Sequence, residues 1–480
     1  MSVTGRIRAD LWTKQSAVII VALLVEASVL LAAYLTSPLY VMLASLAVLW
    51  LVACFLDSIL GVYAIAMTIA SPFFLYLDRQ QSTVLVAGLI AGAIGLFIFG
   101  WDSSENRPRT QLDKAAFFFV TYMALNCISS VYRGNNWLPV LNEFIPIAEM
   151  YAAYWLASRI PFNRKHAQQL LIFVLALVAA RATWQLALFF AGKADTITPP
   201  VYKSADRAMI PLFGVWFVRL IDPLLGLHVG ASLAIFLASP VGFVRRLAAF
   251  TLAATGCALV LSFERAELLA AIVCVLVVLY FRRKQLLKIY ARLAIILVVS
   301  VVGLTLLGSL FKGFSVGLAD VLIARMIDYT RQQLFDPQNS LQQLRLLELV
   351  TVKNAFVSAP LVGLGLGSGV GTDVFGGTGT EYVPIHDYFL GLLANSGLVG
   401  FGLLTYLVYQ TFRRLLFIHR TSQSSFERSW VTFSVVSMVW YGIFVAFHPV
   451  FSAYHIPALL GVYVGVTISM ARVGKFLRVS

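Results

Sequence analysis

Residues 247–281 read LAAFTLAATGCALVLSFERAELLAAIVCVLVVLYF. Two apolar runs, 247–262 and 265–281, are separated here only by Phe263 and Glu264. Each run is close to the ~20 apolar residues that an α-helix needs to cross a bilayer. The stretch therefore predicts two membrane-spanning helices joined by a very short turn.

Apolar runs of this length recur along most of the 480 residues. The chain is 60% hydrophobic and 12% charged, whereas globular proteins average about 45–50% apolar and about 25% charged residues. This composition excludes a disordered protein, a secreted disulfide scaffold and an ordinary soluble enzyme. We expect an all-α polytopic membrane protein with about 12–14 transmembrane helices. The predicted spans are 17–35, 39–56, 58–77, 82–100, 114–131, 143–158, 168–190, 226–240, 247–262, 265–281, 291–311, 386–411, 429–447 and 456–472.

The net charge of +14 comes from basic residues that stand in short clusters between the apolar runs, such as Arg282–Lys284 and Arg413–Arg414. Short loops rich in Lys and Arg remain on the cytoplasmic side of a membrane. Counting them predicts that both termini are cytoplasmic, and it explains the charge without a nucleic-acid partner. The four cysteines all lie inside apolar runs, which favours small buried hydrophobes over disulfides or metal ligands.

Two outer loops divide the chain. We expect transmembrane helices over 1–311 with an outer loop at about 191–225, a large helical periplasmic loop over 312–385, and further transmembrane helices over 386–480. In the second loop, Ser340 to Gln343 resembles a capping box that opens a helix ending before Pro360. A glycine-rich segment follows it. Both loops carry basic residues, which suggests an anionic ligand at the outer face.

The sequence has no P-loop, no D-x-D pair and no H-E-x-x-H. We therefore expect chemistry that uses neither ATP nor a nucleotide sugar, and no cofactor or metal.

His386 is the candidate general base. It opens the predicted span at 386–411, where the positive end of the helix dipole disfavours an imidazolium ion. A neutral imidazole accepts a proton at physiological pH, as a base must. The alternative is a histidine that only caps the span at the membrane interface.

Two arginines are candidates for binding phosphate. Arg265 stands in the short outer turn, where topology does not favour a positive charge, and a guanidinium can hold a phosphate with two parallel hydrogen bonds. Arg345 lies in the predicted loop helix. The alternatives are an ion pair of Arg265 with Glu264 or Glu267 and a solvated Arg345. Weaker candidates for the substrate cavity are Arg207, Arg219, Arg331, Asp387 and Glu143.

Three motifs in order resemble the superfamily of O-antigen ligases and O-antigen polymerases, which are bacterial envelope glycosyltransferases. They are the turn from Ser262 to Ala266, the Pro-Leu-x-Gly-x-Gly run from Pro360 to Gly365, and the stretch from His386 to Gly400. The resemblance is firmest over about 260–400. Two residues depart from the family pattern: Asp387 stands where the family usually has Asn, and Glu264 precedes the arginine.

The resemblance implies a glycan donor linked to undecaprenyl diphosphate and an acceptor that is another glycan or lipid A core. It also implies the bilayer as an environment and allows for a chain-length regulator or assembly proteins as partners. The enzyme would lie in the bacterial inner membrane with its active site facing the periplasm. Arg265 and Arg345 would then stabilise the leaving diphosphate, and His386 would deprotonate the acceptor hydroxyl for transfer with inversion. The large number of spans slightly favours a polymerase over a ligase.

Two other functions remain open from the sequence. A transporter or flippase for a lipid-linked glycan would share the spans and the substrate, and a zinc enzyme could use His386, His448 and His455. Four charged residues inside spans suggest a Glu–Arg pair that positions helices, namely Glu26, Glu143, Glu149 and Arg181.

Overall fold

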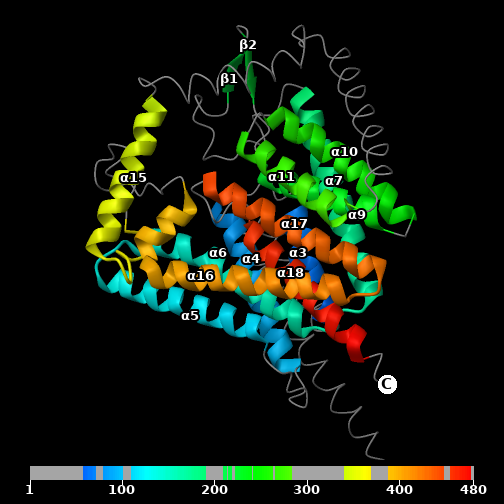
Figure 1. The fold of residues 1–480 in the computed structure, drawn as a ribbon, viewed down its shortest axis with the longest axis horizontal. Coiled ribbons are helices and arrows are strands. Elements are labelled where there is room, and N and C mark those ends of the chain that lie inside the picture. The colour runs from blue at the N-terminus through cyan, green and yellow to red at the C-terminus, as the bar shows by residue number, and fades with distance from the viewer. Residues whose placement is uncertain are drawn as a thin grey trace, which may run out of the picture.

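The computed structural model describes residues 58–71, 79–100, 110–190, 209–212, 215–218, 222–239, 242–262, 265–283, 340–368, 387–447 and 455–476. Within these ranges the chain is a bundle of helices (Figure 1). The helices are α3 (Ser58–Ala70), α4 (Arg79–Gly100), α5 (Gln111–Tyr132), α6 (Trp137–Arg159), α7 (Arg164–Phe190), α9 (Pro223–Ala238), α10 (Gly242–Ser262), α11 (Arg265–Phe281), α15 (Ser340–Ser358), α16 (Tyr388–Thr421), α17 (Ser425–Phe447) and α18 (Ile456–Phe476).

The all-α polytopic membrane fold is confirmed. Among the described helices, α5, α7, α10, α16, α17 and α18 are long and apolar enough to cross a membrane. The predicted spans 17–35, 39–56 and 291–311 lie outside the described residues, and each of the other spans overlaps a described helix. The overlap is least complete for the span 58–77, because α3 ends at Ala70. Within the predicted loop at 191–225, the structure has an antiparallel hairpin that we did not expect, formed by β1 (Met209–Leu212) and β2 (Val215–Val218).

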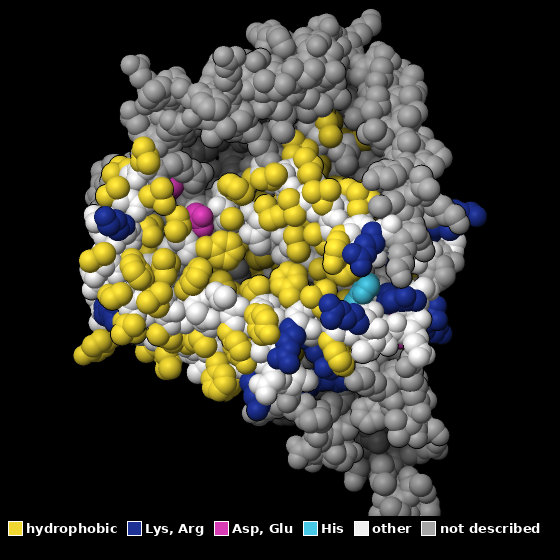
Figure 2. Space-filling model, viewed as in Figure 1, with side chains coloured by type: hydrophobic (Ala, Val, Ile, Leu, Met, Phe, Trp, Pro, Cys, Tyr) yellow, Lys and Arg dark blue, Asp and Glu magenta, His cyan; other side chains and the backbone are white. Residues whose placement is uncertain are grey.

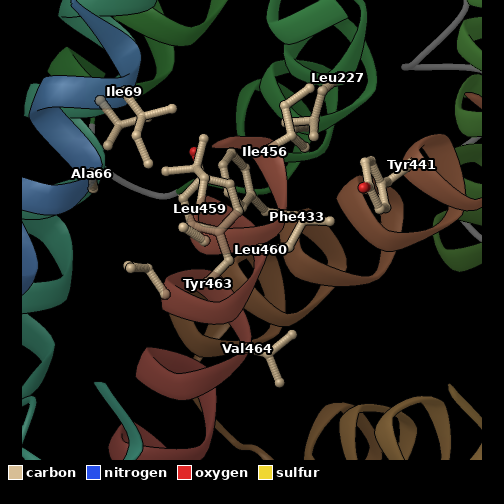
Figure 3. Close-up of a cluster of buried hydrophobic side chains, with 14 of the residues drawn as sticks. Ala66, Ile69, Leu227, Phe433, Tyr441, Ile456, Leu459, Leu460, Tyr463 and Val464 are labelled. Carbon is tan, nitrogen blue, oxygen red and sulfur yellow. The ribbon is translucent and has the colours of Figure 1, made fainter. Parts of the chain in front are cut away.

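The centre of the bundle is built around α18, which packs along α6. Gly461 and Gly465 allow this approach, because a Cβ atom at Gly461 would lie 2.4 Å from the carbonyl oxygen of Met150. Small residues at helix contacts are typical of membrane proteins. Figure 3 shows the apolar core at this place, where side chains of α18 meet those of α3, α9 and α17. Labelled members include Ile456, Leu459, Leu460, Tyr463, Ala66, Ile69, Leu227 and Phe433.

Charged groups inside the bundle are paired, but not as we expected. Arg181 pairs with Asp222 rather than with a glutamate: its Nε lies 2.5 Å from one carboxylate oxygen and its Nη2 lies 3.0 Å from the other. Arg181 also donates to the carbonyl oxygens of Ile69 and Ser71, at the end of α3. The pair is fully buried and ties α7 to the N-cap of α9.

Glu149 contacts His455, whose Nδ1 lies 2.8 Å from the carboxylate. The other ring nitrogen of His455 lies 3.2 Å from Ser82 Oγ. Both nitrogens of this buried imidazole are thus engaged within the bundle, which counts against a zinc-ligand role for His455. His448 and His386 lie outside the described residues.

The bundle has two distinct ends. At one of them, which we call the basic end, the ring of Phe281 at the end of α11 lies 4.8 Å from that of His419 near the end of α16. Burial and, secondly, the nearby Arg428 of α17 lower the pKa of Arg282 at this end. Figure 2 shows the Lys and Arg side chains of this face gathered mainly toward one side, with hydrophobic side chains over the rest. The opposite end, where α16 begins, we call the loop end.

Candidate functional site

At the loop end, α16 is broken at Gly397, which has φ 62° and ψ −166°. In an unbroken helix the N–H groups of Leu398 and Val399 would bond to the carbonyls of Ala394 and Asn395. The break frees all four groups inside an apolar bundle, where an unsatisfied backbone group is costly. We expected one continuous span over 386–411, so the break is a correction to that prediction.

The loop after α15, residues 359–368, satisfies every one of these groups. Backbone N–H groups of the loop donate to the freed carbonyls, and backbone carbonyls of the loop accept from the freed N–H groups. The bonds are Leu364 N–H to Ala394 O (3.0 Å), Gly365 N–H to Asn395 O (2.9 Å), Leu398 N–H to Pro360 O (2.9 Å) and Val399 N–H to Leu361 O (3.1 Å). The Pro-Leu-x-Gly-x-Gly run and the Asn395–Gly400 segment are distant in sequence but form one structural unit. We call it the joined unit.

Glycines make this close approach possible. Gly363 and Gly397 both have positive φ, which disfavours a side chain. A Cβ atom at Gly363 would lie 2.4 Å from the carbonyl carbon of Asn395, and one at Gly397 would lie 2.4 Å from the carbonyl carbon of Leu361. The obstructing atoms belong to the backbone of the loop in one case and of α16 in the other. Neither segment can therefore move aside for a side chain.

Polar side chains of α5 and α6 hold the unit in the bundle. Asn395 Nδ2 donates to both carboxylate oxygens of Glu143, at 3.2 and 3.0 Å, and Gly367 N–H donates to the same carboxylate at 3.2 Å. On α5, Asn126 donates to Val362 O and accepts from Leu366 N–H. Four further side chains donate hydrogen bonds within the unit: Tyr122 to Ser396 O, Arg133 to Gly363 O, Asn135 to Leu366 O and Ser368 to Asn395 Oδ1.

Glu143 was predicted as a residue of the substrate cavity. In the structure its carboxylate accepts hydrogen bonds from Asn395 and Gly367 within the joined unit. The residues that sequence reasoning missed are Asn126, Asn135 and Asn395. For Asn126 and Asn395 a signal was available, because an amide side chain inside an apolar run must find partners, but the partners could not be identified without the fold. Asn135 stands in the turn between α5 and α6 and gave no such signal.

The helix α15 carries the candidate Arg345. It ends at Ser358, before Pro360 as predicted, and lies beside the start of α16 (Figure 1). Val352 and Ala355 of α15 form a small apolar cluster with Ala394 of α16. Position 345 precedes the buried Glu348 and Val352 by three and seven residues, so it falls on the same helix face.

Asp387 is the N-cap of α16. Its Oδ1 accepts the backbone N–H groups of Phe389 at 2.8 Å and Leu390 at 3.1 Å. Asn is an equally good cap, which explains how Asp can stand where the resembling family has Asn. We expected His386 in the first turn, but the helix begins two residues later, at Tyr388. His386 directly precedes the cap in the chain and lies outside the described residues.

Arg265 is the first residue of α11. Because the last turn of α11 and the last turn of α16 meet at the basic end, the first residues of both helices lie toward the loop end. Arg265 and Asp387 are thus placed toward the same end of the bundle. The remaining candidates, Arg207, Arg219 and Arg331, lie outside the described residues.

The sequence model of the O-antigen ligase family matches residues 247–405. This segment is similar to the O-antigen ligase family. The match takes in α10, α11, α15 and the broken part of α16, so it covers the joined unit described above together with Arg265, Arg345 and His386. The comparison with curated proteins finds no match.

This match supports membership of the O-antigen ligase and polymerase superfamily. At family level it indicates glycosyltransferase activity in glycan ligation or polymerisation, with a lipid-linked glycan and an acceptor as substrates. Its first and last residues lie within helices of the membrane bundle, so the matched segment is part of the bundle and does not stand apart from it.

Proposed function

We propose that this protein transfers a glycan from undecaprenyl diphosphate to a sugar hydroxyl at the periplasmic face of the bacterial inner membrane, with inversion and without a metal. The observation that supports this proposal most strongly is the joined unit, which lies within the segment matched by the O-antigen ligase family. In it the loop 359–368 connects the end of α15 to the first turns of α16 by hydrogen bonds. This connects the helix of Arg345 rigidly to the helix that starts after His386.

The proposed chemistry uses three side chains. His386 takes the proton of the acceptor hydroxyl, and the oxygen attacks the anomeric carbon from the face opposite the leaving group. The bond from that carbon to the diphosphate oxygen breaks, and undecaprenyl diphosphate leaves with the electron pair. Arg265 and Arg345 stabilise the negative charge that develops on the diphosphate. The other candidates, Arg207, Arg219, Arg331 and Asp387, would line the sugar path, and Glu143 would position Asn395.

Orientation supports this proposal. The basic end carries Arg282, Arg283, Arg413, Arg420 and Arg428, and loops rich in Lys and Arg remain cytoplasmic. The loop end would then face the periplasm, with both termini on the cytoplasmic side. The starts of α11 and α16 lie toward this loop end, as a shared site for one diphosphate requires.

A pure carrier of the same lipid is the second candidate function, and a transfer assay separates the two. Purified protein in liposomes receives undecaprenyl-diphosphate-linked glycan and, in parallel reactions, either lipid A core or a second lipid-linked glycan. A new glycosidic product is expected with one acceptor, and the acceptor that reacts distinguishes a ligase from a polymerase. Lipid movement across the bilayer with no product from either acceptor would overturn the proposal in favour of the carrier.

A further inference from the structure

A basic cavity of about 720 Å³ lies at the basic end, on the far side of the bundle from the proposed active site. Its lining includes Arg413, Arg414 and Arg420 of α16 together with Gln410, and the first turn of α5 closes one side. The mechanism proposed above does not use this cavity. The described lining residues include no Asp or Glu, so the cavity presents positive charge alone.

Arg414 shows that the cavity is poised for an anion. Its guanidinium lies over the ring of Phe417, 5.7 Å from the centroid. Its Nε is buried, and within the described part of the chain it has no hydrogen-bond acceptor. A buried donor without an acceptor is costly, and an anion in the cavity would offset part of that cost through its attraction to the guanidinium charge.

The nearest candidate to neutralise these arginines is Asp113 on α5, and it is already engaged. Its carboxylate accepts from Thr110 N–H at 2.7 Å and from Tyr154 OH at 2.7 Å, and it lies 3.4 Å from Arg472. These contacts fix the start of α5. Asp113 also attracts the Arg414 guanidinium and offsets part of its charge, but the three arginines of the lining leave the cavity net positive.

The walls favour a lipid over a free ion. Leu112, Leu416 and Phe417 line the same cavity as the arginines, and Phe417 is 46% exposed. Arginines above apolar side chains at the end of a membrane bundle match a phosphodiester head group that continues into acyl chains. We propose that the cavity binds the head group of an anionic phospholipid, with Arg413, Arg414 and Arg420 on the phosphate.

The test is native mass spectrometry of the full-length protein after exchange into detergent with defined lipid, comparing retention of phosphatidylglycerol and phosphatidylcholine. We expect preferential retention of phosphatidylglycerol. The triple variant Arg413→Gln/Arg414→Gln/Arg420→Gln should lose at least about fivefold of that retention, because it removes all three arginines that line the cavity. The matched control Arg245→Gln/Arg246→Gln/Arg283→Gln removes the same number of exposed arginines that do not line the cavity and should lose clearly less retention than the cavity triple.

Two results would overturn the proposal. One is equal retention of phosphatidylglycerol by the cavity triple and the control triple. The other is displacement of the lipid by glycerol phosphate at the same concentration, because a site for free phosphate would not need the acyl chains. Should the triple variant fail to fold, the single variant Arg413→Gln at an exposed position decides by the same comparison with Arg245→Gln.

Discussion

The side-chain amide of Asn395 is held by both carboxylate oxygens of Glu143, at 3.2 and 3.0 Å, across the contact between α16 and α6. The same carboxylate also accepts the backbone N–H of Gly367. One side chain of α6 therefore fixes both partners of the joined unit, the broken helix and the loop that fills the break.

The Glu143–Asn395 contact predicts that acceptor capacity matters more than charge at position 143. Glu143→Ala leaves the buried amide of Asn395 without these partners and should lower the free energy of unfolding by about 1–3 kcal/mol. Glu143→Gln retains an amide oxygen that can accept, so it should lose clearly less. Thermal unfolding of the purified variants measures both, and equal losses for the two would contradict the assigned role.

Gly397 should tolerate no side chain. Gly397→Ala places a Cβ 2.4 Å from the backbone of Leu361 at a positive φ, so we expect a loss of about 1 kcal/mol or more in stability together with loss of glycan transfer. Gly402→Ala is the matched control in the same helix, because a Cβ there meets nothing within 4 Å. Indistinguishable unfolding temperatures for the two variants would refute the close approach of loop and helix.

Asp387 should be replaceable by Asn but not by Ala. Asn caps a helix as well as Asp does, whereas removing the cap costs about 0.5–2 kcal/mol. Asp387→Asn should therefore retain stability and transfer, and Asp387→Ala should lose both in part. If Asp387→Asn is as inactive as Asp387→Ala, the carboxylate has a chemical role beyond capping.

Arg181 and Asp222 should act on folding alone. Removing one partner of a buried ion pair leaves an uncompensated charge and costs about 3–5 kcal/mol, so Arg181→Gln should yield much less folded protein. Arg245→Gln, at an exposed position, should stay within about 0.5 kcal/mol of the parent. Size-exclusion profiles and unfolding curves of the two variants provide the comparison.

The sequence predicted the helices of the bundle well because a span is set by local apolar length. The end of α15 before Pro360 was predicted in the same way, because a proline cannot continue a helix. By contrast, the break at Gly397 was missed even though Asn395, Ser396 and Gly397 form a polar interruption of the run. A single glycine in an apolar helix is common, and only the loop that satisfies the freed backbone groups makes a break stable.

Pairings between distant segments were beyond local reasoning. The presence of Arg181 in an apolar run predicted a buried acidic partner, yet the sequence suggested a glutamate of another span and the fold provides Asp222. Similarly, Glu149 pairs with His455 and Glu143 with Asn395. Which charges meet depends on helix order and depth in the bundle, and neither is encoded in spacing along the chain.

Glycan transfer by the purified His386→Ala variant, compared with the unaltered protein on a lipid-linked donor and its acceptor, tests the central claim most directly. Removing a general base should lower the rate by about 10²–10⁴-fold while the unfolding temperature stays unchanged. Arg265→Ala should also abolish transfer, and Arg265→Lys should recover it only in part, because an ammonium lacks the two-pronged geometry of a guanidinium. A His386→Ala protein that transfers glycan at the parent rate would contradict the account.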